Sequence, residues 1–185
     1  VGRAKIKPGQ IVLIMGGSSG VGIFGIQIAK LYGCTVIATA SPDKLEKLKE
    51  LGADYAVDHR KEDWHKEVRT ITKEITGTAG IDVIFEHIGG SHFNKELTLL
   101  KYGATLVTTG ATTGYDVPVD LRHIFFKGIN ILGSTQGTRA ELEQGFRWMG
   151  QGKIKAIIDS VFTFENAASA HKKMLNGKGL VGKII

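Results

Sequence analysis

Cysteine is nearly absent from this chain, because Cys34 is the only one among 185 residues. A single thiol excludes an internal disulfide and any metal site built from several thiolates. Chains without disulfides are typical of the cytosol, so we expect a cytoplasmic location. The length fits one domain, or one domain plus a fragment of another, and can bury a core without covalent cross-links.

Long apolar runs are missing as well. No stretch approaches the roughly 20 apolar residues that a membrane-spanning helix needs, and no signal-peptide pattern opens the chain. We therefore expect no membrane partner. The first residue is Val1 rather than methionine, which favours a piece cut from a longer protein.

The formal net charge of +6 does not point to a nucleic-acid partner. In residues 43–50, Asp-Lys-Leu-Glu-Lys-Leu-Lys-Glu, lysines are interleaved with acids. Opposite charges at this spacing pair on the solvated side of a helix. No RNA- or DNA-binding motif accompanies the charge. We expect a basic surface and no nucleic-acid partner.

Short apolar runs alternate with longer segments of helical periodicity. Residues 11–15 are continuously apolar, as in a strand buried on both faces. The other expected strands are 35–40, 55–57, 81–86, 105–109 and 129–134, and the expected helices are 20–32, 42–51, 64–76, 91–101, 120–127 and 138–151. This alternation predicts right-handed parallel βαβ units in an α/β fold with a doubly wound, six-stranded sheet. The tail differs, with apolar runs at 157–162 and 180–185 around a helix at about 165–176.

A glycine-rich loop follows the first expected strand, with the sequence Gly-Gly-Ser-Ser-Gly-Val-Gly-Ile-Phe-Gly over residues 16–25. A G-x-G-x-x-G match is weak alone, but here it lies between a buried strand and a helix. We expect Gly17 to permit the sharp turn and Gly20 to leave room for a pyrophosphate. Gly22 or Gly25 would let the helix pack close to the strand. The loop predicts a bound dinucleotide at the helix N-terminus; the alternative is a tight turn with no ligand.

The end of the second expected strand bears on which dinucleotide binds. An NAD site usually has an acid about 20 residues beyond the glycines for the ribose 2′-hydroxyl. Residues 38–41, Ala-Thr-Ala-Ser, contain no carboxylate, and Asp43 is explained by the helix start. The candidate ligands of a 2′-phosphate are Ser41, Lys44, His59 and Arg60. We expect NADP, with NAD less favoured; a solvated Lys44 is the alternative for that residue.

The chain resembles the cofactor-binding half of the medium-chain dehydrogenases and reductases, particularly zinc-alcohol-dehydrogenase-like and NADPH:quinone-reductase-like members. The matching segments are 7–9, 17–22, 49–54, 86–90, 110–114, 132–135 and 182–185. The resemblance implies a Rossmann domain over residues 1–160. It also implies that residues 161–185 are a remnant returning toward a missing GroES-like catalytic domain.

The resemblance further implies hydride transfer between NADP(H) and a small alcohol, carbonyl, quinone or enone. Residues aligned with the family's pyrophosphate loop are Gly17, Ser18, Ser19, Gly20, Val21 and Gly22. Residues expected near the ribose or nicotinamide are Ile88, Gly89, Gly110, Ala111, Ser134 and Thr135. Ser19 stands where many members have a glycine, which departs from the strict fingerprint.

The substrate pocket of the family, and its zinc ligands where present, lie mainly in the domain that is absent here. No Cys/His/Glu cluster with zinc spacing occurs, so zinc is expected only in a full-length parent. No catalytic residue can be assigned. His87 follows a strand end and could border the nicotinamide cleft, but a packed or capping histidine is the favoured interpretation.

Two alternative functions remain open from the sequence. One is a dinucleotide-binding regulatory module without turnover, and the other is an enoyl-reductase module of a larger synthase. We expect the isolated chain to bind dinucleotide and to turn over little or no substrate. The sixth strand is expected at an open sheet edge, which favours a homodimer slightly over a monomer.

Overall fold

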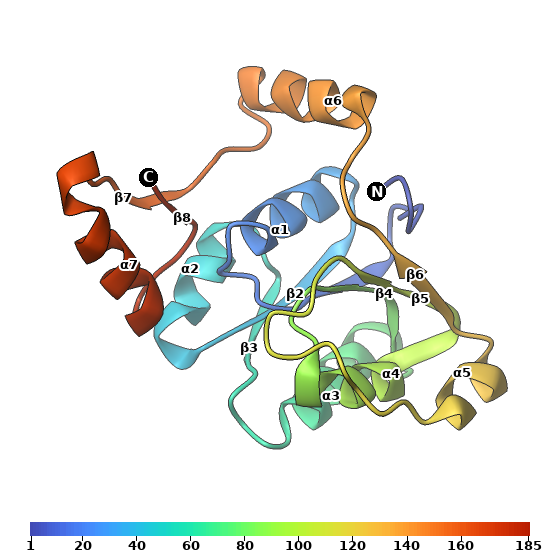
Figure 1. The fold of residues 1–185 in the computed structure, drawn as a ribbon. Coiled ribbons are helices and arrows are strands. Elements are labelled where there is room, and N and C mark those ends of the chain that lie inside the picture. The colour runs from blue at the N-terminus through green and yellow to red at the C-terminus, as the bar shows by residue number, and fades with distance from the viewer.

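The computed structural model describes residues 1–185 and has an α/β architecture (Figure 1). The main sheet contains six parallel strands in the order β3-β2-β1-β4-β5-β6. These strands are β1 (Ile11–Ile14), β2 (Thr35–Ala40), β3 (Tyr55–Asp58), β4 (Ile81–Glu86), β5 (Leu100–Thr108) and β6 (Asn130–Gly133). This order is that of a dinucleotide-binding doubly wound sheet, so the predicted fold class is confirmed.

Helices cover both faces of the sheet, as Figure 1 shows. On one side lie α1 (Gly22–Leu31) and α2 (Leu45–Glu50), the latter preceded by the short η1 (Pro42–Lys44). On the other side lie α3 (Trp64–Thr76), η2 (Gly90–His92), α4 (Phe93–Leu99) and α5 (Leu121–Lys127). The right-handed crossovers of parallel strands require helices on the two faces.

Alternate residues of β1 and its extension belong to two separate cores. Ile11, Leu13 and Met15 pack in a cluster with residues of α3 and α4. Val12 and Ile14 pack in a second cluster with residues of α1 and α2. Successive side chains of a strand point to opposite faces, so one apolar run supplies both cores. This explains why the run at 11–15 shows no polar alternation.

One boundary differs from the expectation. The helix expected over 91–101 ends at Leu99, and β5 begins at Leu100 instead of residue 105. Leu100 adopts an extended backbone directly after the helix and pairs with Ile81 of β4. The strand reaches further back because this pairing buries Leu100.

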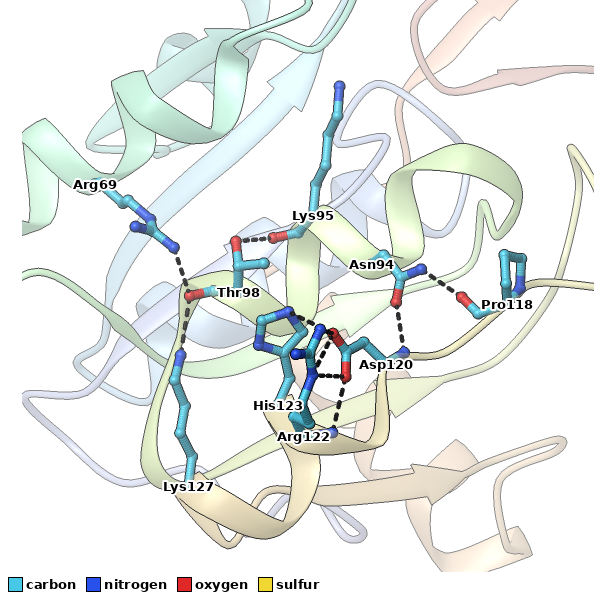
Figure 2. Close-up of polar contacts among 9 residues, drawn as sticks. All are labelled: Arg69, Asn94, Lys95, Thr98, Pro118, Asp120, Arg122, His123 and Lys127. Atoms are coloured by element: carbon cyan, nitrogen blue, oxygen red, sulfur yellow. Dashed lines mark hydrogen bonds and ion pairs between the residues drawn. The ribbon is translucent and has the colours of Figure 1, made fainter.

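Figure 2 shows the hydrogen bonds that connect α5 with the end of α4. Lys127 donates hydrogen bonds to the carbonyl oxygens of Thr98 and Leu100 at 3.0 and 2.9 Å. Arg69 of α3 donates to the same Thr98 carbonyl at 3.0 Å. At the other end of α5, the Asp120 carboxylate accepts from the Arg122 amide and caps the helix. The contacts of Lys127 and Arg69 satisfy the Thr98 carbonyl near the end of α4, which the helix leaves without an intrahelical partner.

The tail forms a second, smaller unit. Helix α6 (Arg139–Gly150) precedes the tail in the chain. The tail itself contains β7 (Ile158–Ser160), η3 (Phe164–Asn166), α7 (Ala167–Asn176) and β8 (Lys183–Ile184). Strands β7 and β8 pair in parallel. Just before β8, Gly182 donates its backbone amide to the Ser18 carbonyl at 2.9 Å. The last residues of the chain therefore lie against the glycine loop.

None of the helices has both the length and the apolar character to span a membrane.

Candidate functional site

The candidate site residues follow the carboxyl ends of the six parallel strands. From one sheet edge to the other they are His59 and Arg60 after β3, Ser41 and Lys44 after β2, Gly17 to Gly22 after β1, Ile88 and Gly89 after β4, Gly110 and Ala111 after β5, and Ser134 and Thr135 after β6. In open α/β sheets, ligands bind outside this edge of the sheet. The topology thus brings residues from six separate chain segments to one edge.

The turn out of β1 lies one residue earlier than expected. Gly16 has a φ of +58°, a left-handed conformation that favours glycine. Gly17 does not have a positive φ. Gly17 is required for another reason. A Cβ there would lie 3.0 Å from Cβ of Ala38 on β2 and 3.2 Å from Cδ1 of Ile26 on α1. Gly17 therefore allows close packing, and Gly16 makes the turn.

Gly22 closes the loop onto itself. A Cβ on Gly22 would lie 2.3 Å from the Gly16 carbonyl oxygen and 2.7 Å from Cα of Gly17, and backbone atoms cannot give way. Gly25 performs the helix–strand packing, since its Cβ would lie 3.1 Å from the Phe85 ring on β4. Of the two glycines expected to allow close helix–strand packing, Gly25 lies against the strand and Gly22 lies against the loop.

The loop presents unused backbone donors at the start of α1. The amides of Gly16, Gly17, Ser19 and Gly22 donate to protein oxygens. By contrast, the amides of Ser18 and Val21 donate to no protein acceptor. Val21 is the N-cap residue of α1, a helix of 10 residues, and no side chain caps it. Free amides and the positive end of the helix dipole together suit an anion such as a pyrophosphate.

Thr39, near the end of β2, holds the glycine loop in place. Its hydroxyl oxygen accepts the Gly16 amide at 3.1 Å, and its carbonyl accepts the Gly17 amide at 2.7 Å. The same hydroxyl lies 3.4 Å from Nδ1 of His59. Thr39 is fully buried, so the loop is anchored to the core rather than to solvent-exposed groups.

The end of β2 carries no carboxylate aimed at the loop. Ser41 occupies the expected N-cap position of the following turn, but its side chain does not cap it. The nearby Ser41 hydroxyl, followed by the hydrogen bond from the Gly179 amide, lowers the pKa of Asp43 to about 2. The Asp43 carboxylate is thereby engaged by the tail, while Lys44 makes no hydrogen bond or ion pair with its side chain.

His59 and Arg60 adjoin this end of the sheet. Burial, with the nearby His92 second, lowers the pKa of His59, and Arg60 and Lys44 lower it further. Arg60 is exposed and donates only its backbone amide, to Asp58. Lys44 and Arg60 therefore bring two positive charges beside the end of β2, next to the half-buried His59 and the Asp58 carboxylate.

The segment after β4 is organised by a buried carboxylate. Glu86 accepts the amides of Ile88 and Gly89 through Oε1 at 2.5 and 2.7 Å, and the Thr108 hydroxyl through Oε2 at 3.2 Å. Gly89 has a φ of +71°, and a Cβ there would lie 2.4 Å from the Gly114 carbonyl. The loops after β4 and β5 are thus locked together by Glu86 and by backbone contact.

Ser134 and Thr135 line an apolar groove beside the glycine loop. The groove has a volume of about 640 Å³ and lies between α1, the sheet and the N-terminal residues. Its walls include Val21, Phe24 and Phe85. Val21 belongs to both the loop and the groove, so the two features are continuous.

Lys183 is a residue that the sequence did not single out for the site. Its side chain covers Gly20, where a Cβ would lie 2.0 Å from Cε and 2.5 Å from Nζ of Lys183. Gly182 forms an isolated parallel bridge with Ser19 and aims the next side chain at the loop. The local pattern Gly-Lys-Ile-Ile contains no sign of this contact, because its partner lies at the opposite end of the sequence.

His87 also reaches the loop. Its Nε2 lies 3.4 Å from Oγ of Ser19, and its ring contacts the backbone side of Gly16. Burial lowers the pKa of His87, while Glu86 acts in the opposite direction. The half-buried ring fits the favoured expectation of a packed histidine, and its approach to Ser19 brings it beside the glycine loop.

The chain brings together no group of three or more His, Cys, Asp or Glu side chains that could hold a metal ion. No zinc site is therefore assigned to these residues.

Comparison with known proteins gives a family and several related structures. Residues 20–151 match the family described as zinc-binding dehydrogenase. A quinone oxidoreductase of Pongo abelii is 31% identical over 189 residues, covering 98% of this chain and 56% of the relative. The chain thus spans about half the length of the curated relatives it matches.

Two solved structures bear on the cofactor. An NAD-dependent alcohol dehydrogenase superposes with a TM-score of 0.89 at 36% identity, covering 100% of this chain and 52% of that one. A 2-octenoyl-CoA carboxylase reductase, in complex with NADP and 2-octenoyl-CoA, superposes with a TM-score of 0.88 at 27% identity, covering 98% and 44%. These relatives bind a nicotinamide dinucleotide, but not the same one.

Proposed function

The chain belongs to the zinc-binding dehydrogenase family, as its resemblance to medium-chain dehydrogenases predicted, and we propose that it is the NADP(H)-binding half of an oxidoreductase. The full protein would transfer a hydride between the nicotinamide and a small alcohol, carbonyl, quinone or enone. The observation that carries this proposal is the loop at residues 16–22, where the Ser18 and Val21 amides are free and Lys183 lies opposite.

In this proposal the pyrophosphate lies on the glycine loop. The Ser18 and Val21 amides donate to its oxygens at the N-terminus of α1. Lys183 supplies a mobile positive charge from the far side of the loop. The absence of a side chain at Gly20 leaves the space in which the Lys183 side chain lies against the loop, so its ammonium can meet a ligand bound there.

The adenosine end would lie beside Ser41, Lys44, His59 and Arg60. Preference for NADP over NAD is supported by the missing carboxylate at the end of β2 and by the engagement of Asp43 with Gly179. The uncommitted Lys44 and the exposed Arg60 suit a 2′-phosphate.

The nicotinamide end would lie along Ile88, Gly89, Gly110 and Ala111, toward Ser134 and Thr135. When bound, the nicotinamide supplies or accepts the hydride, and the protein orients it. The buried Glu86 keeps the backbone of Ile88 and Gly89 fixed for this purpose. The apolar groove that begins at Ser134 and Thr135 would exclude water from this end.

A second candidate is an enoyl-reductase module of a larger synthase, favoured by the similarity to the 2-octenoyl-CoA carboxylase reductase. It shares the dinucleotide site and differs in the substrate that the rest of the protein selects. A regulatory module without turnover is the third candidate. Turnover of an enoyl thioester by the full-length protein would favour the enoyl-reductase module, turnover of an alcohol or quinone would favour the first candidate, and absence of turnover would favour the regulatory module.

We also propose a domain boundary between residues 160 and 161, which falls between β7 and η3.

Pairing of two copies through the exposed edge of β6 is proposed because β6 ends the sheet. The single free thiol, the buried Cys34, suits a reducing compartment, so we propose a cytoplasmic location.

The first test is calorimetric titration of the chain with NADPH and with NADH at equal, low ionic strength. Tighter binding of NADPH is expected. Tighter binding of NADH would overturn the NADP assignment and keep the dinucleotide site. Failure of both to bind would contradict the dinucleotide site of this chain.

A further inference from the structure

Two polar side chains meet across the glycine loop, one from the loop and one from the end of β4. Nε2 of His87 and Oγ of Ser19 are 3.4 Å apart. The Ser19 oxygen also accepts the Gly22 amide at 2.9 Å, so one of its lone pairs is already used. Ser19 therefore joins the helix start, the loop and His87.

The hydrogen-bond direction between these two residues depends on whether Nε2 of His87 carries a proton. When the imidazole is neutral at Nε2, the Ser19 hydroxyl donates its proton to that nitrogen. When the imidazole is protonated, Nε2–H donates to the remaining lone pair of Ser19. The Ser19 hydroxyl proton then becomes free to turn toward a ligand above the loop.

We propose that His87 takes up a proton from solvent when a dinucleotide binds, and thereby releases the Ser19 hydroxyl to donate to the pyrophosphate. The proposal rests on the dinucleotide site proposed above. His87 acts here as a positioning residue through Ser19. The only bond that forms is the N–H bond at Nε2 of His87, and its proton comes from hydronium in the solvent, which becomes water.

The charged groups around His87 allow its imidazole to take up a proton. Its own strand end contributes the Glu86 carboxylate, which two amides and the Thr108 hydroxyl hold in place. From the tail, Lys183 brings one positive charge to the loop. The elements that contact His87 from β1 and β5, at Gly16, Gly110 and Thr112, carry no charge.

Electrostatics sets the direction of the change. Burial lowers the pKa of His87 below the ordinary 6.5, which keeps the ring neutral in the free protein near pH 7. A pyrophosphate beside the ring favours the charged form and raises this pKa, by about one unit or more for an opposite charge within about 6 Å. Binding therefore tightens as the pH falls toward 6.5.

The test is calorimetry at pH 6.5 with NADH, in two buffers that differ in ionisation enthalpy. NADH lacks the 2′-phosphate, so His59 beside the adenosine end contributes less to the signal. The native chain is expected to take up a substantial fraction of a proton per NADH bound. His87→Gln should abolish this uptake, whereas the control His171→Gln, on the exposed face of α7, should retain it.

A second measurement on the native chain avoids any effect of the substitution on folding. Histidine Cε1–Hε1 NMR resonances are followed against pH, with and without saturating NADH. The His87 titration is expected to move to higher pH by about one unit.

Three results would overturn the proposal. One is NADH binding by the native chain without proton uptake, and another is uptake unchanged in His87→Gln. An unmoved His87 titration at saturating NADH is the third. Absence of binding by both NADH and NADPH would instead remove the dinucleotide site, and this inference with it.

Discussion

The carboxylate of Asp43 accepts a hydrogen bond from the backbone amide of Gly179 at 2.7 Å. This contact ties the end of β2 to the turn between α7 and β8. It also turns the acid that follows β2 in the sequence toward the tail. We expect Asp43→Ala to increase hydrogen exchange at residues 179–181 and to change NADH affinity by less than about twofold. A large loss of NADH affinity in this variant would show that Asp43 binds the ribose instead.

Substitution of Lys44 tests whether the site prefers NADPH over NADH. Lys44→Ala is expected to weaken NADPH binding about tenfold, or about 1.4 kcal/mol, with little effect on NADH, because only NADPH carries a 2′-phosphate. Lys47→Ala removes a neighbouring lysine whose ammonium pairs with Glu50, and serves as the matched control. Equal losses for the two cofactors, measured by titration calorimetry, would remove Lys44 from the 2′-phosphate site.

Lys183 tests the pyrophosphate site independently of the 2′-phosphate. Lys183→Met is expected to weaken NADH and NADPH to the same extent, by about tenfold, and to reduce the dependence of binding on salt. The control is Lys178→Met, an exposed lysine of the preceding turn. If Lys183→Met binds both cofactors as tightly as the native chain, the ammonium does not contact the pyrophosphate.

Two glycines should respond in opposite directions to the same substitution. Gly22→Ala places a Cβ against the backbone of Gly16 and Gly17, and should destabilise the fold by about 1–3 kcal/mol and impair dinucleotide binding. Gly145 lies inside α6 with no atom near its Cβ position. Gly145→Ala should therefore stabilise the fold by about 0.5–1 kcal/mol. Urea unfolding measures both; equal effects would contradict the loop geometry.

Glu96 predicts an unusual pH dependence of stability. Both carboxyl oxygens are buried without a hydrogen-bond partner, and burial, with Glu86 nearby, raises the pKa of Glu96 well above 4.5. A folded state that holds an extra proton loses stability as pH rises above the unfolded pKa, by at most about 1.4 kcal/mol per pH unit. Below about 4.5 the carboxyl is protonated in both states, and this loss disappears.

Glu96→Gln removes the titrating group, so we expect its gain in melting temperature to be larger at pH 8 than at pH 5. Glu74→Gln, at an exposed position of α3, should show no such trend. A gain for Glu96→Gln that does not change between the two pH values would argue against a neutral, buried carboxyl group.

Local patterns predicted most of the sheet, because each parallel strand is an apolar run buried on both faces. The start of β5 was mislocated, because Lys101 and the exposed Tyr102 do not look like a strand. This end of the strand is defined by the pairing of Leu100 with Ile81, and such a pairing is not visible in the local sequence. The left-handed turn was assigned to Gly17 instead of Gly16 because the sequence alone does not distinguish two adjacent glycines. Only the three-dimensional packing separates them, since the Cβ position of Gly17 faces Ala38 and Ile26.

The candidate site was predictable where its residues follow strands, since the carboxyl ends of parallel strands share one edge. The site was not predictable where it depends on the tail. Lys183 reaches Gly20 only because Gly182 pairs with Ser18 and Ser19, and no periodicity records such a pairing. Thr39 was missed for a similar reason, because inside an apolar run a threonine looks like any other strand residue.

The pairing of Gly182 with the glycine loop also bears on the order of folding. Ser18 and Gly182 are far apart in the sequence, and contacts between such distant residues form late in folding. An intermediate in which the tail has not yet docked could contain the sheet and the loop and still lack the charge of Lys183 beside Gly20. Dinucleotide affinity would then report docking of the tail on the loop, and not only formation of the sheet.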